Sequence, residues 1–186
     1  MSDTALIVID VQESFRHQMF WSDAHVPAFA ARLQDLIDGA RVRRYPIVQV
    51  FHVGQTPQFA PESGFVRTLS PISIDPDAVF HKRKHSALVG TGLDVWLTQR
   101  GIRRVIVAGI RSEQCCETTA RHASDLGWTV DFVSEATLTF AMTDTAGRTY
   151  TAEQIKERTE LVLAGRFARI ATVDQALAGP VWPVAA

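Results

Sequence analysis

The chain has 186 residues, of which 46% are hydrophobic and 21% charged, and its formal net charge is −1. A chain of this length predicts a single domain over residues 1–186 with a core of its own. The balance of basic and acidic residues excludes a general nucleic-acid binder, and the apolar content excludes disorder. The two cysteines are adjacent, the apolar runs are short and no signal peptide is visible, so we expect a cytoplasmic protein that does not span a membrane.

Two kinds of hydrophobic pattern alternate along the chain. Short, nearly unbroken apolar runs predict strands that are buried on both faces, and apolar residues at helical spacing predict helices between them. The expected strands are 5–10, 46–52, 78–81, 103–109, 128–133 and 169–173, and the expected helices are 26–42, 92–99, 113–126 and 151–164. This order predicts an α/β fold: a doubly wound, mostly parallel sheet with helices on both faces, in three layers.

Three smaller features complete this outline. Residues 53–77 form a long expected loop with four of the eight prolines, and it is either a lid or binding loop or an insertion without a role. Ser112 is the expected N-cap of the helix 113–126. The uncharged C-terminal segment 179–186 is expected either to pack on a second subunit or to fray.

Reactive side chains follow three of the expected strands. Asp10 ends the first strand, Lys82 and Lys84 follow the strand 78–81, and Cys115 comes shortly after the strand 103–109. Each has an ordinary explanation, as a capping carboxylate, a surface lysine or a core thiol. Ligands of open parallel sheets bind beyond the carboxyl ends of the strands. The convergence of a carboxylate, an amine and a thiol on this edge therefore predicts a catalytic site.

The chemistry of such a site would be acyl transfer. A thiol near a helix N-terminus and beside an ammonium is expected to have a lowered pKa, and a carboxylate can accept its proton. Backbone N–H groups of the turn 110–115 are placed to stabilise an oxyanion. Cys116 lies about 100° further around the helix than Cys115, and we expect it to pack in the core.

Three sequence blocks resemble the isochorismatase-like cysteine hydrolase superfamily. They are IDVQESF, HKRKHSALVGTGLD and VIVAGIRSEQCCETTARHASDLGW, and the resemblance extends from residue 5 to about residue 137. It implies a catalytic triad of Asp10, Lys82 and Cys115, with Lys82 in the register of the family lysine in place of Lys84. The chain departs from the family pattern at Leu88, Ser112 and Cys116, which replace the usual Phe, Thr and Val.

The resemblance also implies a backbone arrangement at the nucleophile. A non-proline cis peptide bond is expected before it, which by position is Ile110–Arg111. Its expected use is to direct the backbone N–H of Arg111, with that of Cys115, toward a substrate oxygen as an oxyanion hole. A small residue is usual at position 111, so Arg111 is a departure. Its side chain either recognises a substrate carboxylate or points to solvent or to a partner subunit.

The substrate class remains open at this level. Nicotinamidases of the superfamily have an Asp-x-His metal site after the second strand, but here His52 has no acidic neighbour, so we expect no metal and no cofactor. The preferred function is hydrolysis of a small-molecule amide or carbamoyl C–N bond. The alternatives are hydrolysis of the vinyl ether isochorismate, or a binding protein without activity; a thiol-redox role lacks a Cys-x-x-Cys motif.

The remaining expectations concern the pocket and the assembly. The candidate pocket residues are Gln12, Phe15, Trp21 and His52, together with the loop 53–77. The resemblance suggests a homodimer or a homotetramer.

Overall fold

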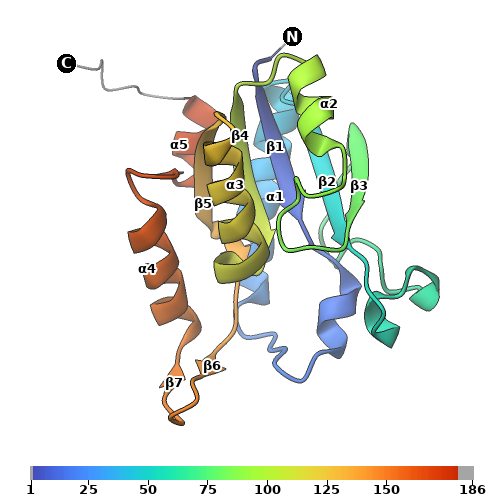
Figure 1. The fold of residues 1–186 in the computed structure, drawn as a ribbon, viewed down its shortest axis with the longest axis vertical. Helices are drawn as coiled ribbons and strands as arrows, with labels where there is room; N and C mark the ends of the chain where they lie inside the picture. The colour runs from blue at the N-terminus through green and yellow to red at the C-terminus, as the bar shows by residue number, and fades with distance from the viewer. Residues whose placement is uncertain (1, 180–186) are drawn as a thin grey trace.

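A six-stranded parallel sheet forms the centre of the computed structural model, which describes residues 2–179 (Figure 1). Its strands follow one another in space in the order β3-β2-β1-β4-β5-β8, and every neighbouring pair is parallel. Their bounds are β1 Thr4–Ile9, β2 Ile47–His52, β3 Ala78–Lys82, β4 Arg104–Ile110, β5 Thr129–Leu138 and β8 Arg169–Ile170. All residues of β1 and β4 are buried, as their unbroken apolar runs predict.

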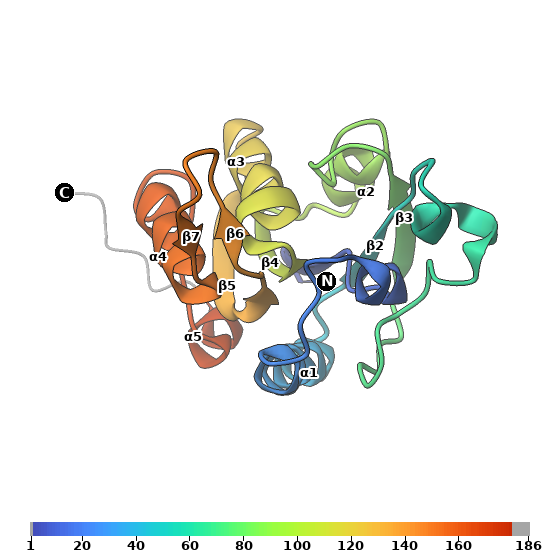
Figure 2. The same cartoon turned by 90° about the horizontal axis from the view of Figure 1, so that it is seen from below.

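Helices cover both faces of this sheet, which confirms the predicted three-layer α/β fold (Figure 2). One face carries α1 (Val26–Val42) and α5 (Val173–Ala178), and the other carries α2 (Leu93–Gln99), α3 (Glu117–Asp125) and α4 (Ala152–Leu163). The core accordingly consists of two clusters of buried apolar side chains, one on each side of the sheet. Parallel strands buried between two such layers need no polar face, since neither side of the sheet meets water.

The chain after β4 differs from the predicted elements. The strand expected at 128–133 continues to Leu138 as β5, and a two-stranded hairpin, β6 (Met142–Thr143) with β7 (Thr149–Tyr150), follows it. The strand expected at 169–173 ends at Ile170, because a capping box between Thr172 and Gln175 starts α5. Strands of two residues, and a helix that starts directly after such a strand, are too short to produce a hydrophobic period in the sequence.

Short 3₁₀ turns occupy parts of the connections. They are η1 (Glu13–His17), η2 (Pro57–Phe59) and η3 (Pro61–Ser63), and the last two lie within the loop 53–77. Within residues 2–179, no helix combines the length and the apolar character needed to cross a membrane. The segment 179–186, a candidate subunit contact, lies outside the described residues from Pro180 onward.

Candidate active site

The candidate site lies where the strand order reverses. From β1 the sheet extends to β2 and β3 on one side and to β4 and β5 on the other, so the carboxyl ends of β1 and β4 flank the crevice of a doubly wound sheet (Figures 1 and 2). Asp10 follows β1, Lys82 ends β3, and Cys115 follows β4. The topology thus brings to one edge three residues that are far apart in the sequence.

Backbone geometry at this edge is specialised. Gly109 of β4 has φ +131°, and an added Cβ atom would collide with the carbonyl oxygen of Ile9. Only glycine therefore lets β4 approach β1 this closely, directly beside Asp10. Asp10 itself has φ 54°, a left-handed conformation that costs a non-glycine residue on the order of 1 kcal/mol. The surrounding structure holds this conformation, which turns the carboxylate into the crevice.

Lys82 joins the three reactive groups. Its side chain is almost fully buried (1% exposed), and its Nζ lies 2.7 Å from Asp10 Oδ2 and 3.3 Å from Cys115 Sγ. A further hydrogen bond of 3.0 Å runs from this Nζ to the carbonyl oxygen of Lys84. Lys84 contributes only its backbone carbonyl to this cluster, since the residue itself is exposed. The ammonium therefore bridges the carboxylate and the thiol while the protein backbone fixes it in place.

Cys115 sits in a π-helical turn. This turn, η4 (Ser112–Cys116), precedes α3 and contains the wider hydrogen bond from the Cys116 N–H to the Arg111 carbonyl, 3.2 Å. The Cys115 thiol lines the cavity at the sheet edge, whereas Cys116 is fully buried in the core. The peptide bond Ile110–Arg111, which leads into the turn, is cis.

The expected N-cap at Ser112 is wrong. The side chain of Ser112 makes no cap, and its Oγ lies 2.6 Å from the Oγ1 of Thr137 on β5. This hydroxyl pair ties the nucleophile turn to the neighbouring strand. The sequence carries no signal for this pair, because the two residues are 25 positions apart and both are of types common at caps and in strands.

The electrostatics differ from the expectation of a lowered thiol pKa, which is wrong. Burial and, to a smaller extent, the carboxylate of Asp10 raise the pKa of the Cys115 thiol to about 12, against the opposing effect of Lys82. Burial also raises the pKa of Asp10, although Lys82 opposes that shift. For Lys82, burial alone would lower the pKa, but Asp10 and Cys115 together raise it.

These directions favour a neutral thiol, a lysine ammonium and a carboxylate more basic than usual. Asp10 Oδ1 has no hydrogen-bond partner among the described residues. Beside a neutral thiol, a carboxylate oxygen of this kind can act as a proton acceptor.

A cavity of about 360 Å³ opens onto these groups. That volume lies at the small end of the range for ligand pockets. Its walls are mostly aromatic and uncharged polar side chains. Besides Asp10 and Cys115, the lining residues are Phe15, Gln18, Phe20, His52, Gly54, Gln55, Thr56, Phe59, His85, Arg111 and Gln114.

The predicted pocket residues divide into two pairs. Phe15 and His52 line the cavity, whereas Gln12 and Trp21 are not among its lining residues in the described chain. Gln12 instead pairs with the backbone of His52, donating to its carbonyl at 3.0 Å and accepting from its N–H at 2.8 Å. Trp21 packs against Phe140, with ring centroids 5.1 Å apart. Gln12 thus positions a pocket residue, and Trp21 supports the wall from outside.

His52 contacts Lys82 directly. Its Nδ1 lies 3.2 Å from the Nζ of Lys82. Burial, together with the neighbouring Lys82 and His85, lowers the pKa of His52 to about 4. A neutral imidazole at pH 7 can accept a hydrogen bond from the ammonium through Nδ1, and its Nε2 then carries the proton.

His85 is a pocket residue that sequence analysis missed. It is exposed, lines the cavity and has its Nδ1 3.8 Å from Cys115 Sγ. The signal was present in the run HKRKH, which also contains Lys82. The run resembles an ordinary solvated basic turn, so nothing in it distinguished this histidine from its neighbours.

The loop 53–77 has two parts. Residues 54–56 and Phe59 line the cavity, which favours the interpretation as a binding loop for this part. Further along, Thr68 forms an isolated bridge with Gln12, and Leu69 is buried in the core cluster beside α1. The second part therefore fastens the first to the sheet edge.

No group of three or more His, Cys, Asp or Glu side chains is arranged to hold a metal ion within residues 2–179.

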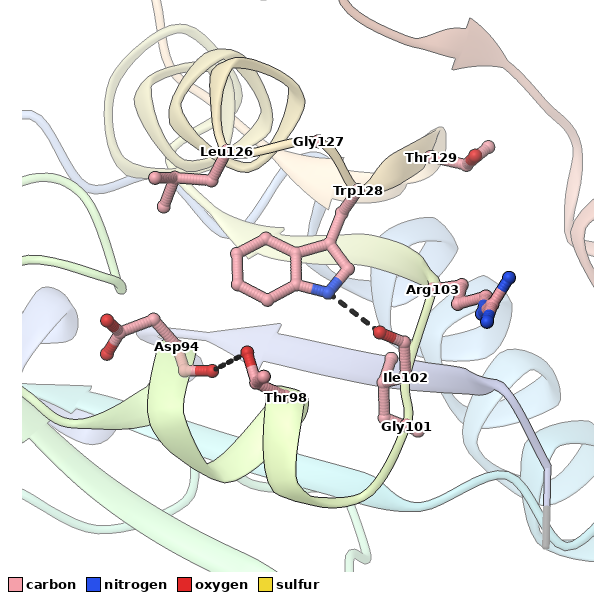
Figure 3. Close-up of a pocket in the computed structure, with 9 residues that line it drawn as sticks. All are labelled: Asp94, Thr98, Gly101, Ile102, Arg103, Leu126, Gly127, Trp128 and Thr129. Carbon is pink, nitrogen blue, oxygen red and sulfur yellow. Dashed lines mark hydrogen bonds between the residues drawn. The ribbon is translucent and has the colours of Figure 1, made fainter.

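A second, larger cavity of about 660 Å³ lies at the opposite edge of the sheet (Figure 3). It is formed where α2 and α3 end and β4 and β5 begin, and its hydrogen bonds are structural: the Trp128 indole donates to the Ile102 carbonyl at 2.9 Å. Its nine lining residues include Asp94 and Arg103 but no thiol, amine or imidazole. By volume, this cavity would be the better candidate for an active site than the smaller one. The smaller cavity is the better candidate by chemistry, because the reactive side chains line it.

Comparison with known proteins agrees with this fold. A family model described as the isochorismatase domain matches residues 4–164. The Bacillus subtilis isochorismatase family protein YrdC is 27% identical over 174 residues, covering 92% of each chain. Nicotinamidase 3 of Arabidopsis thaliana is 36% identical over 100 residues, which are 54% of this chain and 45% of the relative. A solved structure of an isochorismatase family protein from Chromobacterium violaceum superposes with a TM-score of 0.86 at 26% identity, covering 95% of this chain and 93% of that one.

Proposed function

Because the chain belongs to the isochorismatase family of hydrolases, we propose that it hydrolyses the C–N bond of a small amide or carbamoyl compound through a thioester on Cys115. The observation that carries this proposal is the buried cluster in which one ammonium lies 2.7 Å from a carboxylate and 3.3 Å from a thiol at the wall of a small cavity. The partial similarity to a nicotinamidase supports an amide as the substrate.

In the first half of the reaction, the Cys115 sulfur attacks the substrate carbonyl carbon while its proton passes to Asp10. Lys82 stabilises the developing thiolate and holds the carboxylate in line. The backbone N–H groups of Arg111 and Cys115 stabilise the oxyanion of the tetrahedral intermediate. Asp10 then returns the proton to the departing nitrogen, the C–N bond breaks, and an acyl group remains on the sulfur.

In the second half, a water molecule attacks the thioester carbonyl and gives its proton to Asp10. Collapse of this second intermediate breaks the C–S bond, and the sulfur regains its proton from Asp10. The products are an acid and ammonia or an amine, and the site returns to its resting state. Asp10 thus acts alternately as base and acid, which suits a carboxylate whose pKa is raised.

The test is an ammonia-release screen of small primary amides and carbamoyl compounds, combined with mass spectrometry of the acid-quenched protein. We expect ammonia release by the wild type, an acyl group on the Cys115 peptide, and neither in Cys115→Ala. Cys116→Val is the matched control, because Cys116 lies in the core beside the nucleophile, and it should retain activity. Ammonia release that persists in Cys115→Ala would contradict the proposal, as would consumption of isochorismate without any acyl-enzyme or amide turnover.

A further inference from the structure

Arg111 carries a cation into the wall of the catalytic cavity. The residue is only 7% exposed, and its guanidinium carbon lies 4.6 Å from the ring centroid of Phe20 and 5.9 Å from that of Phe140. Both Arg111 and Phe20 line the cavity. The interpretation in which this side chain points to solvent is therefore wrong. An aromatic face fixes the plane of the guanidinium without using any of its hydrogen-bond donors.

The hydrogen-bonding groups of Arg111 are incompletely paired. A guanidinium has five N–H groups. Its Nη2 forms an ion pair with Glu113, 2.9 Å from Oε1, but this oxygen accepts no hydrogen bond within residues 2–179. The Nε of Arg111 is buried and has no hydrogen-bond partner in the described part of the chain. The other oxygen of Glu113 accepts from the hydroxyl of Thr139 at 2.5 Å. Buried donors without acceptors are costly, so this arrangement is incomplete without a further acceptor.

The other charges of the cavity do not supply that acceptor. The carboxylate of Asp10 is paired with Lys82. His52 is neutral at pH 7, because its pKa is lowered to about 4. His85, the remaining titratable side chain of the wall, lies at the thiol. The one carboxylate in the described lining is thus already paired, and the planar fork of donors on Arg111 matches a further carboxylate.

We propose that the substrate carries a carboxylate, which Arg111 binds while the amide or carbamoyl group meets Cys115. This inference rests on the proposed function and narrows its substrate class to small amide acids. The alternative is that Arg111 forms a structural ion pair with Glu113 and has no part in binding.

The test measures protection of Cys115 from iodoacetamide, a readout that does not depend on ammonia release. It is made at about pH 10, where a thiol whose pKa is raised to about 12 still supplies a small fraction of thiolate. The probes are malonamate and succinamate, each compared with the neutral diamide of the same length, and the labelled peptide is quantified by mass spectrometry. We expect the amide acids to protect with roughly tenfold higher affinity than the diamides, as a hydrogen bond to a charged group predicts.

Variants then assign the effect to one side chain. Arg111→Gln should abolish the preference for the amide acids, and Arg111→Lys, which keeps the charge but loses the fork, should retain part of it. The matched control is Arg100→Gln, because Arg100 also lies over an aromatic ring, 4.0 Å from the centroid of Trp96, but does not line this cavity. It should leave the preference unchanged.

Equal protection by amide acids and diamides, no protection by either amide acid, or a preference that survives in Arg111→Gln would overturn the inference. Failure of the proposed function has a different signature: the protection pattern would be present, but no ammonia would be released and no acyl-enzyme would form.

Discussion

The two edges of the sheet both carry a cavity, and they differ in what the strands deliver to it. At the carboxyl edge, the last residue of β3 and the segments that follow β1 and β4 place an ammonium, a carboxylate and a thiol close together beside a cavity of about 360 Å³. At the amino edge, the cavity is larger, about 660 Å³, but its hydrogen bonds only close the connections between helices and strands. Function therefore follows the direction of the strands, since every loop that leaves a parallel strand at its carboxyl end faces the same crevice.

The largest difference between the edges should appear in activity. Cys115→Ser is expected to lower kcat by about 10³-fold or more, because a hydroxyl that relies on the same carboxylate is a much weaker nucleophile than a thiol. Asp94→Asn and Arg103→Gln at the amino edge should each leave kcat/KM within about twofold of the wild type. Steady-state ammonia release measures the activity of all three variants. A comparable loss of activity in Asp94→Asn or Arg103→Gln would contradict the distinction between the two edges.

How far the sequence predicts this site depends on the kind of residue. Asp10, Lys82 and Cys115 each follow an apolar run, so the rule for parallel sheets brings them together without coordinates. Phe20 and the Arg111 side chain could not be placed, because they lie in or beside connections that have no period. The direction of the Cys115 pKa shift was missed for a physical reason: burial outweighs the lysine, and burial depends on the packing of the whole edge.

The same limit applies to the fold. The long runs of β1 and β4 predicted their strands, whereas the hairpin strands β6 and β7 and the start of α5 at a capping box were beyond the reach of periodicity.

Each edge of the sheet has a glycine with a positive φ, so the two edges can also be compared by how much a Gly→Ala substitution destabilises the protein. Gly109→Ala should reduce the free energy of unfolding by about 3 kcal/mol, because the new Cβ atom would collide with the Ile9 backbone at a positive φ. Gly101→Ala at the amino edge also has a positive φ, +66°, but meets nothing within 4 Å and should cost only about 1 kcal/mol. Urea unfolding measures the free energy of unfolding of both variants. Equal reductions would show that the close approach of β4 to β1 adds nothing to the cost of a Cβ atom at Gly109.

A smaller effect is expected in the pH dependence of stability. The pKa of His52 is lowered from 6.5 to about 4 in the folded protein, so the unfolded chain binds this proton more tightly. The resulting stability is fully present above pH 6.5 and is lost as the pH falls toward 4. For a half-buried group, screened by solvent, we expect a loss of about 2 kcal/mol over this range.

His52→Gln should flatten this part of the pH profile, whereas His81→Gln, a substitution of an exposed histidine on β3, should not. Chemical denaturation at a series of pH values measures the difference. An unchanged slope in His52→Gln would mean that His52 is protonated as readily in the folded protein as in the unfolded chain.

The smallest effect is expected at the amino edge. Trp128→Phe removes the indole hydrogen bond to the Ile102 carbonyl and should reduce the free energy of unfolding by about 1 kcal/mol. Activity should not change, since Trp128 does not line the catalytic cavity. A drop in kcat/KM without a change in stability would show that the amino edge influences the reaction.

The most direct test of the central claim, that Asp10 takes the proton of a neutral Cys115 thiol, is the pH dependence of Cys115 alkylation by iodoacetamide in the wild type and in Asp10→Asn. Because burial and the Asp10 carboxylate both raise the thiol pKa, to about 12, the wild-type rate should still be rising at the highest pH measured. Removing the negative charge leaves Lys82 beside the sulfur, so the pKa of Cys115 in Asp10→Asn should fall although hydrolysis is lost. A wild-type titration below the ordinary thiol value of about 8.5, or a pKa that does not fall in Asp10→Asn, would contradict the account.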